Sequence, residues 1–184
     1  MNIMHLQESM LRNSIAFIML LATCVGARAQ DIKEVPFKSD KFGVSFDYKS
    51  SFKVKDMSEG NQFKVVATLE GVEFIFTAIP ETPGHTVAEF SNYIHDYMQK
   101  ADAAKTNFRI TDNTASEVSG NKVYYTCEFY DKETVKNANH IMILDLPFKY
   151  SMGIMLKVVS PYDPELEKLV LREMLAMLAS FKKV

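Results

Sequence analysis

The sequence predicts an α+β fold, an α/β/α sandwich in which helices pack on both faces of a central antiparallel meander sheet. The first observation behind this prediction is a run of three strands expected at 123–130, 141–146 and 148–159. The middle strand is apolar at both parities, and since side chains alternate across a strand, both of its faces must be covered. The second observation is a pair of segments with helical spacing of apolar residues, one on each side of these strands in the chain.

Composition places the chain among ordinary globular proteins. It has 184 residues, of which 47% are hydrophobic and 24% charged, so a single domain with a full core is expected. The formal net charge is −2 and no basic run stands out, which argues against nucleic acid as a partner. No spacing of His, Cys and acidic residues matches a metal site, and no cofactor motif occurs in the sequence.

The N-terminal residues have the three parts of a secretory signal peptide. A basic start is followed by a short apolar run and by Ala27-Arg28-Ala29, which fits a signal peptidase site. The apolar run is too short to span a bilayer. Cleavage between Ala29 and Gln30 would remove 1–29 as the signal peptide and leave 30–184 as one domain, which predicts a periplasmic or secreted protein.

A second processing route competes with this one. Cys24 ends the sequence Leu21-Ala22-Thr23-Cys24, which resembles a loose lipoprotein box, and a lipidated Cys24 would anchor the protein to a membrane. Thr23 is a poor residue before a lipidated cysteine, whereas the site at Ala29 fits well. Ordinary cleavage is therefore favoured over lipidation.

The remaining elements follow from local patterns. A polar lead-in at 31–40 precedes an alternating strand at 42–48, and a hairpin is expected at 63–69 and 72–79 around Glu70-Gly71. A more polar strand at 108–118 is expected at a sheet edge. The last helix should begin at Pro164 behind an Asp163 N-cap and end near Phe181.

The first helix is predicted from a capping box and an apolar stripe. Thr86 and Glu89 have the spacing at which each side chain satisfies an exposed amide at a helix start, and the helix should end near Ala104. Its buried stripe is expected to contain Val87, Phe90, Ile94, Tyr97, Met98 and Ala101.

Three short stretches carry a resemblance to a known family. They are Phe42-Gly43-Val44-Ser45-Phe46-Asp47-Tyr48, Thr86-Val87-Ala88-Glu89-Phe90 and Met177-Leu178-Ala179-Ser180-Phe181-Lys182. With these three stretches in this order along the sequence, the chain resembles the PsbP-like family, which includes DcrB-like bacterial envelope proteins and eukaryotic Ran-binding import factors. It departs from the family after the first strand, where Lys49 and Phe52 stand in place of a Pro and a Trp. The resemblance implies the sandwich fold and a binding or assembly role, but no shared chemistry.

Cys127 and His140 are the candidates for a nucleophile and its base. A loop at 131–139 centred near Thr134 would place Cys127 opposite Ile141, so that Cys127 and His140 would lie on different faces of the sheet. A shift of one residue in this register would bring them together. The favoured interpretation is that Cys127 is a small buried apolar residue.

A candidate partner surface is formed by Tyr124, Tyr130 and Tyr150, since tyrosine is enriched at protein interfaces. The favoured alternative is that these rings support a helix over the sheet. Taken together, these patterns predict an exported, non-enzymatic binding or assembly protein of the bacterial envelope with a protein partner. A carrier of a small apolar ligand is the alternative, and a cysteine hydrolase using Cys127 with His140 is the second alternative.

The processing prediction can be checked on the protein recovered from the envelope. We expect an intact mass for a chain that begins at Gln30, which leaves 184 − 29 = 155 residues. A mass that fits a chain beginning at a lipidated Cys24 would contradict the ordinary cleavage site.

Overall fold

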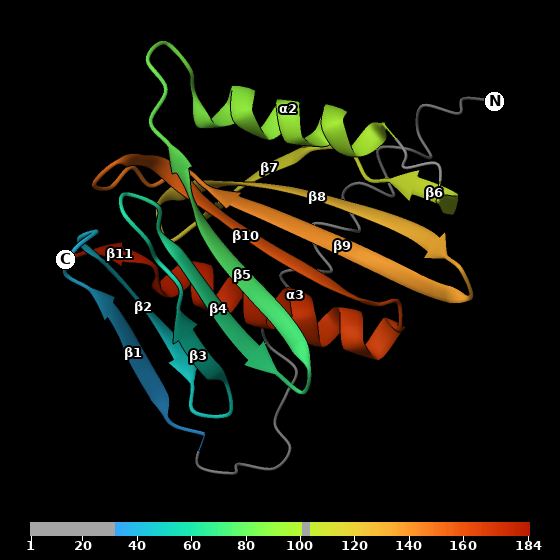
Figure 1. The fold of residues 1–184 in the computed structure, drawn as a ribbon, viewed down its shortest axis with the longest axis horizontal. Helices are drawn as coiled ribbons and strands as arrows, with labels where there is room; N and C mark the ends of the chain where they lie inside the picture. The colour runs from blue at the N-terminus through green and yellow to red at the C-terminus, as the bar shows by residue number, and fades with distance from the viewer. Residues whose placement is uncertain (1–31, 101–103) are drawn as a thin grey trace. The chain divides into compact units, whose positions relative to one another are not determined.

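Within residues 32–100 and 104–184, two antiparallel sheets and two helices make up an α+β fold (Figure 1). The computed structural model describes residues 32–100 and 104–184. The larger sheet has the order β3 (Lys53–Asp56), β4 (Lys64–Leu69), β5 (Val72–Pro80), β10 (Ser151–Pro161), β9 (Val135–Leu144), β8 (Asn121–Lys132) and β6 (Lys105–Ile110), with β7 (Thr114–Val118) also paired to β8. The smaller sheet has the order β1 (Glu34–Ser39), β2 (Val44–Lys49) and β11 (Lys182–Lys183).

The helices begin where their caps predict. Helix α2 (Val87–Gln99) has the full capping box, since the Glu89 amide donates to Thr86 Oγ1 over 3.2 Å and the Thr86 amide donates to Glu89 Oε2 over 2.8 Å. It ends at Gln99, earlier than the predicted Ala104. Helix α3 (Pro164–Ser180) begins after Asp163, whose carboxylate accepts hydrogen bonds from two backbone amides of the first turn.

Strand β9 is the central strand that the sequence predicts, with β8 and β10 as its neighbours. The predicted loop at 131–139 is wrong, because β8 and β9 pair as far as Lys132 and Val135 and leave only a two-residue turn. Glu133 in this turn has a φ of 58°, the backbone region that tight hairpin turns require. The polar residues Lys136, Asn137 and Asn139 are the reason why the sequence predicts a loop here, although all three occupy strand positions of β9.

The strands at the beginning of the described residues differ most from the prediction. The lead-in expected at 31–40 contains strand β1, which pairs with β2, and these two strands form a separate sheet with β11 instead of joining the central one. The Phe46 ring on β2 stacks on Phe76 of the larger sheet and on Phe181 after α3, with centroid separations of 4.6 and 5.4 Å. The smaller sheet therefore covers part of the core.

The single edge strand predicted at 108–118 is two strands. Strands β6 and β7 both pair with β8 and are separated by residues 111–113. Thr111 fills the break, since its amide donates to the Cys127 carbonyl over 2.9 Å and its hydroxyl accepts from the Cys127 amide over 2.9 Å. The backbone of β8 is thus satisfied across the interruption.

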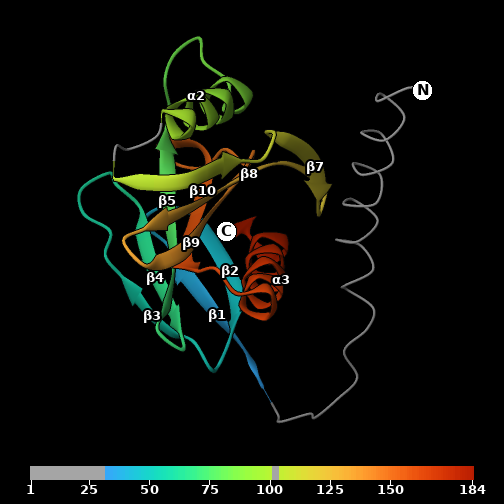
Figure 2. The same ribbon diagram turned by 90° about the vertical axis from the view of Figure 1, so that its right-hand side faces the viewer.

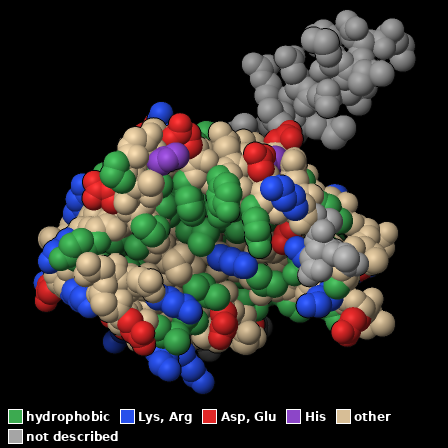
Figure 3. Space-filling view, turned by 45° about the horizontal axis from the view of Figure 1, so that its top comes forward, with side chains coloured by type: hydrophobic (Ala, Val, Ile, Leu, Met, Phe, Trp, Pro, Cys, Tyr) green, Lys and Arg blue, Asp and Glu red, His purple; other side chains and the backbone are tan. Residues whose placement is uncertain are grey.

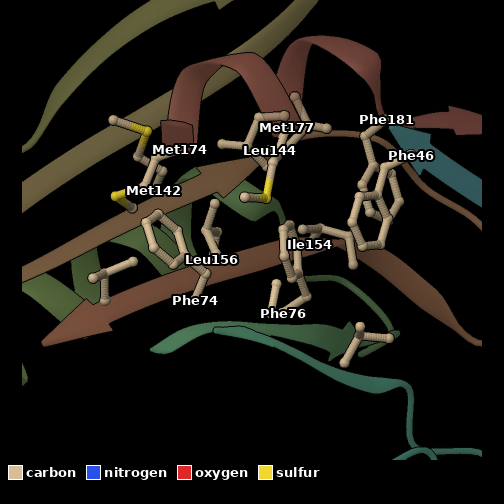
Figure 4. Close-up of a cluster of buried hydrophobic side chains, with 14 of the residues drawn as sticks. Phe46, Phe74, Phe76, Met142, Leu144, Ile154, Leu156, Met174, Met177 and Phe181 are labelled. Atoms are coloured by element: carbon tan, nitrogen blue, oxygen red, sulfur yellow. The ribbon is translucent and has the colours of Figure 1, made fainter. Parts of the chain in front are cut away.

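Two apolar clusters lie on the two faces of the larger sheet. The first lies between the inner face, α3 and the smaller sheet, and Figure 4 shows its Phe, Met and Leu side chains interdigitating. The second lies between the outer face and α2 and includes Ile141 and Ile143 of β9. The two helices lie on opposite sides of the strands in Figure 2. Tyr97 was expected in the buried stripe of α2, but it is 65% exposed.

A buried carboxylate ties α3 to the smaller sheet. Glu173 is buried, and its Oε1 accepts from Lys49 Nζ of β2 over 2.6 Å and from Arg172 Nε over 2.9 Å. Glu165 on the same helix makes a contact of equal length with Lys168, but that pair is exposed to solvent. The two carboxylates differ in burial and in their partners, since Glu173 contacts two cations and joins two elements, whereas Glu165 contacts one lysine of its own helix.

We expect Glu173→Gln to lower the free energy of unfolding by roughly 1–3 kcal/mol, because it leaves Lys49 beside a neutral group in a partly buried site. Glu165→Gln, the matched control, should cost less than about 1 kcal/mol, since exposed pairs contribute little. Urea unfolding of both variants checks this. Equal losses from the two substitutions would contradict the role assigned to Glu173.

Candidate functional site

The structure brings Cys127 and His140 together. The two residues are directly paired across β8 and β9, so the predicted register, which placed Cys127 opposite Ile141, was wrong by one residue. The error comes from the turn, whose centre lies between Glu133 and Thr134 and not at Thr134. Cys127 and His140 therefore share the inner face of the sheet.

This pair is closed to solvent and poorly suited to catalysis. Both side chains are fully buried, and the Tyr125 hydroxyl lies 3.0 Å from His140 Nδ1 in a hydrogen bond. Burial raises the pKa of the Cys127 thiol to about 12 and lowers the pKa of His140 to about 4. At neutral pH the thiol keeps its proton and the imidazole is neutral, whereas a nucleophilic cysteine needs an accessible thiolate.

The three tyrosines predicted as a partner surface do not lie together. Tyr124 packs against the apolar cluster beneath α2, as expected if it supports the helix. Tyr130 lies on β8 near the hairpin turn, with Lys105 Nζ 4.4 Å from its ring centroid. Tyr150 is 45% exposed and lies in the β9–β10 connection, at the opposite end of β9 from that turn.

The most exposed aromatic side chains of the described residues lie on α2. Tyr93 and Tyr97 are 63% and 65% exposed, and their rings stack with centroids 6.5 Å apart and an interplanar angle of 28°. We call this pair the aromatic ridge. Figure 3 views the molecule from the side that bears α2 and shows hydrophobic side chains gathered in the middle of this face.

The aromatic ridge lies along one flank of α2. The opposite flank is fixed to the β6–β7 connection, because His95 Nε2 lies 3.2 Å from the Thr111 carbonyl oxygen and the Ser91 hydroxyl donates to Asn113 Oδ1 over 3.0 Å. At 100° per residue, Tyr93 and Tyr97 are rotated about 160° away from His95 around the helix axis. They therefore lie on the side of α2 that faces away from the β6–β7 connection.

Sequence reasoning missed the ridge for a local reason. Tyr97 is next to Met98, which is buried, and a tyrosine at the margin of an apolar stripe was assigned to the stripe. The centre of the buried face is set by Val87, Ser91 and Met98, and the helical angle from that centre identifies Tyr93 and Tyr97 as flanking positions.

Three cavities of the described residues are open to solvent. One of them has a volume of about 670 Å³, and its lining includes Lys64, Thr77 and Tyr150. Another of about 240 Å³ lies near Arg109 and Tyr162, at the hairpin end of β8 and β9. These cavities mix polar and apolar groups at the surface, so they do not form the enclosed apolar chamber that a small apolar ligand needs.

Within residues 32–100 and 104–184, no group of three His, Cys, Asp or Glu side chains could hold a metal ion. No helix in the same ranges is long and apolar enough to cross a membrane. The predicted cleavage site at Ala29 and Gln30 and the alternative lipidation site at Cys24 lie outside the described residues.

The lowered pKa of His140 predicts a loss of stability in acid. Between about pH 6.5 and pH 4 the His140 imidazole, whose unfolded pKa is near 6.5, is protonated in the unfolded chain but remains neutral in the folded one. The free energy of unfolding should therefore fall by up to about 3 kcal/mol as the pH drops from about 6.5 to 4. Glu167 acts in the opposite direction, because burial raises its folded pKa and its protonation on acidification relieves that cost.

Urea unfolding at several pH values, compared between the wild type and His140→Gln, isolates the histidine contribution. The decrease in the free energy of unfolding between about pH 6.5 and pH 4 should be smaller in His140→Gln than in the wild type. It should be unchanged in His85→Gln, which replaces an exposed histidine. An equal decrease in His140→Gln and in the wild type would contradict the burial of a neutral imidazole.

Comparison with known proteins gives matches only among solved structures. No protein-family model matches the chain, and no curated protein sequence matches it significantly. The Ran-binding protein Mog1p of Saccharomyces cerevisiae aligns with a TM-score of 0.53 at 11% identity, covering 83% of this chain and 96% of that one.

Two further structures align at lower scores. Cyanobacterial PsbP from Synechocystis has a TM-score of 0.48 at 14% identity, covering 88% of this chain and 98% of its own. LpqN of Mycobacterium tuberculosis, involved in cell envelope biogenesis, has a TM-score of 0.49 at 11% identity, covering 79% of this chain and 88% of its own. The alignment with the Ran-binding protein Mog1p confirms, at the level of the fold alone, the resemblance that the sequence predicts.

Proposed function

We propose that this chain is an exported, non-enzymatic binding or assembly protein of the bacterial cell envelope, and that its partner is another protein. The observation that carries the proposal is the aromatic ridge of Tyr93 and Tyr97 on α2. Two stacked rings on a regular helix present a large contact area that loses little side-chain entropy on binding. Tyrosine is accordingly enriched among the residues that dominate binding energy at interfaces.

The closed state of Cys127 and His140 supports a non-enzymatic role. A cysteine hydrolase would need the thiolate that burial disfavours here, together with a cleft that admits substrate to the inner face of the sheet. The open cavities likewise give no support to a carrier of a small apolar ligand.

Two other features support the proposal. The signal-peptide pattern ending at Ala29 supports export and a periplasmic or secreted location. The positions of α2 and α3 on opposite faces support the α/β/α sandwich, and the yeast protein of this fold is a Ran-binding protein. The fold is thus compatible with a protein partner, although fold alone does not specify one.

The test is cross-linked capture from envelope extract with the purified chain as bait. We expect the wild type to recover a reproducible partner and the double variant Tyr93→Ser, Tyr97→Ser to recover at least tenfold less of it. Val135→Ser, which removes an exposed apolar side chain at the β8–β9 turn, away from α2, is the matched control and should capture normally.

Thermal unfolding should show both variants folded, since all three side chains are exposed. The proposal fails if the wild type captures nothing reproducible, or if the double variant captures the same partner as strongly as the wild type does.

A further inference from the structure

Helix α2 covers only part of the outer face of the larger sheet. Its apolar contacts are with β8 and β9 and with Ile79, Met152 and Met155 near one end of β5 and β10. No other element among the described residues lies on this face. The outer side of β3, β4, β5 and the second half of β10 is therefore uncovered in the part of the chain that the structure describes, and we call it the open face.

The strand register gives the composition of the open face. Paired residues of adjacent antiparallel strands point to the same side, so the pairings define rows across the sheet. One row is Lys157, Ile75, Val66 and Lys55, a second is Met155, Thr77 and Lys64, and a third is Glu73, Thr68 and Lys53. Ile75 and Val66 are only partly buried, and they form an apolar strip with lysines along it, while Met155 at its edge packs against the cluster beneath α2.

The charge of the open face is strongly one-sided. Lys53, Lys55, Lys64 and Lys157 lie on it with a single acidic residue, Glu73. None of these four ammonium groups makes an ion pair within residues 32–100 and 104–184, although the whole chain has a formal charge of −2. A partner that complements this face must bring negative charge beside an apolar surface.

The dimensions of the open face suit one helix. From β10 to β3 there are three interstrand spacings, about 14 Å, and an α-helix with its side chains is about 10–12 Å wide. Helix α2 already occupies the neighbouring strip over β8 and β9. A second helix beside it would cover Ile75 and Val66, and its flank would meet the aromatic ridge.

We propose that the open face binds an amphipathic helix of a partner protein, with an apolar stripe on the sheet and acidic residues along both edges facing the lysines. This inference rests on the proposed protein-binding function and names the surface and the chemistry of the partner. A flat anionic membrane is disfavoured as the partner. Helix α2 and the aromatic ridge project beside the open face, so a flat membrane surface that touches them cannot also contact the open face.

The simplest competing explanation is that the lysine stems shield the apolar strip and that the face is only solvated. This alternative predicts no binding at the open face. A defined probe separates the two, namely an 18-residue helical peptide with a leucine stripe flanked by glutamates. A second peptide carries lysines at the glutamate positions.

The experiment records backbone amide spectra of the labelled mature chain during titration with each peptide and with phosphatidylglycerol-containing vesicles. We expect the acidic peptide to shift amides of β4, β5, β10 and the aromatic ridge. Lys55→Glu, Lys157→Glu should weaken this binding at least tenfold, while Lys132→Glu, Lys136→Glu, which reverses two exposed charges near the β8–β9 turn, should leave it unchanged. The lysine peptide should regain affinity for the Lys55→Glu, Lys157→Glu variant.

The inference is overturned if the acidic peptide shifts amides elsewhere, if both peptides bind the wild type equally, or if only the vesicles bind. Capture from envelope extract separates this failure from failure of the proposed function. If the wild type and the Lys55→Glu, Lys157→Glu variant capture the same partner equally, only the inference about the open face is contradicted. If the wild type captures nothing, the protein-binding function itself is contradicted.

Discussion

The pairing of β8 with β9 across a two-residue turn is the constraint on which the rest of the structure depends. Because the side chains of a strand alternate, this register decides which residues of both strands enter the core and which face α2. It places Cys127 and His140 on the inner face, where burial holds both of them uncharged. It also places Ile141 and Ile143 on the outer face, where α2 covers them.

The two faces of the larger sheet are covered unequally, and the difference separates stability from binding. The inner face is covered by α3 and by the smaller sheet, which are joined through stacked Phe46 and Phe181 and through the ion pairs of Glu173. Among the residues that the structure describes, one amphipathic helix, α2, covers part of the width of the outer face. The side that is most completely buried thus carries no accessible chemistry, while the partly covered side presents the aromatic ridge and four lysines to solvent.

Features set by neighbouring residues could be predicted from the sequence, whereas features set by distant pairing could not. The caps at Thr86 and Asp163, the hairpin at Glu70-Gly71 and the fold-level resemblance are local signals, and the structure has all of them. The separate sheet of β1, β2 and β11 joins the two ends of the described chain, so no window of sequence contains it. The open face is hidden in the same way, because its lysines come from β3, β4 and β10 and form no basic run.

The position of β11 has a consequence for the order in which the chain acquires its structure. Strand β2 pairs with Lys182 and Lys183, and Phe46 stacks on Phe181, so residues near the beginning of the domain obtain their partners only when its last residues are available. Contacts so far apart in sequence are expensive in loop-closure entropy and tend to form late. A chain built in this way cannot complete its core until its last residues have been synthesised, so the smaller sheet should be among the last parts to form.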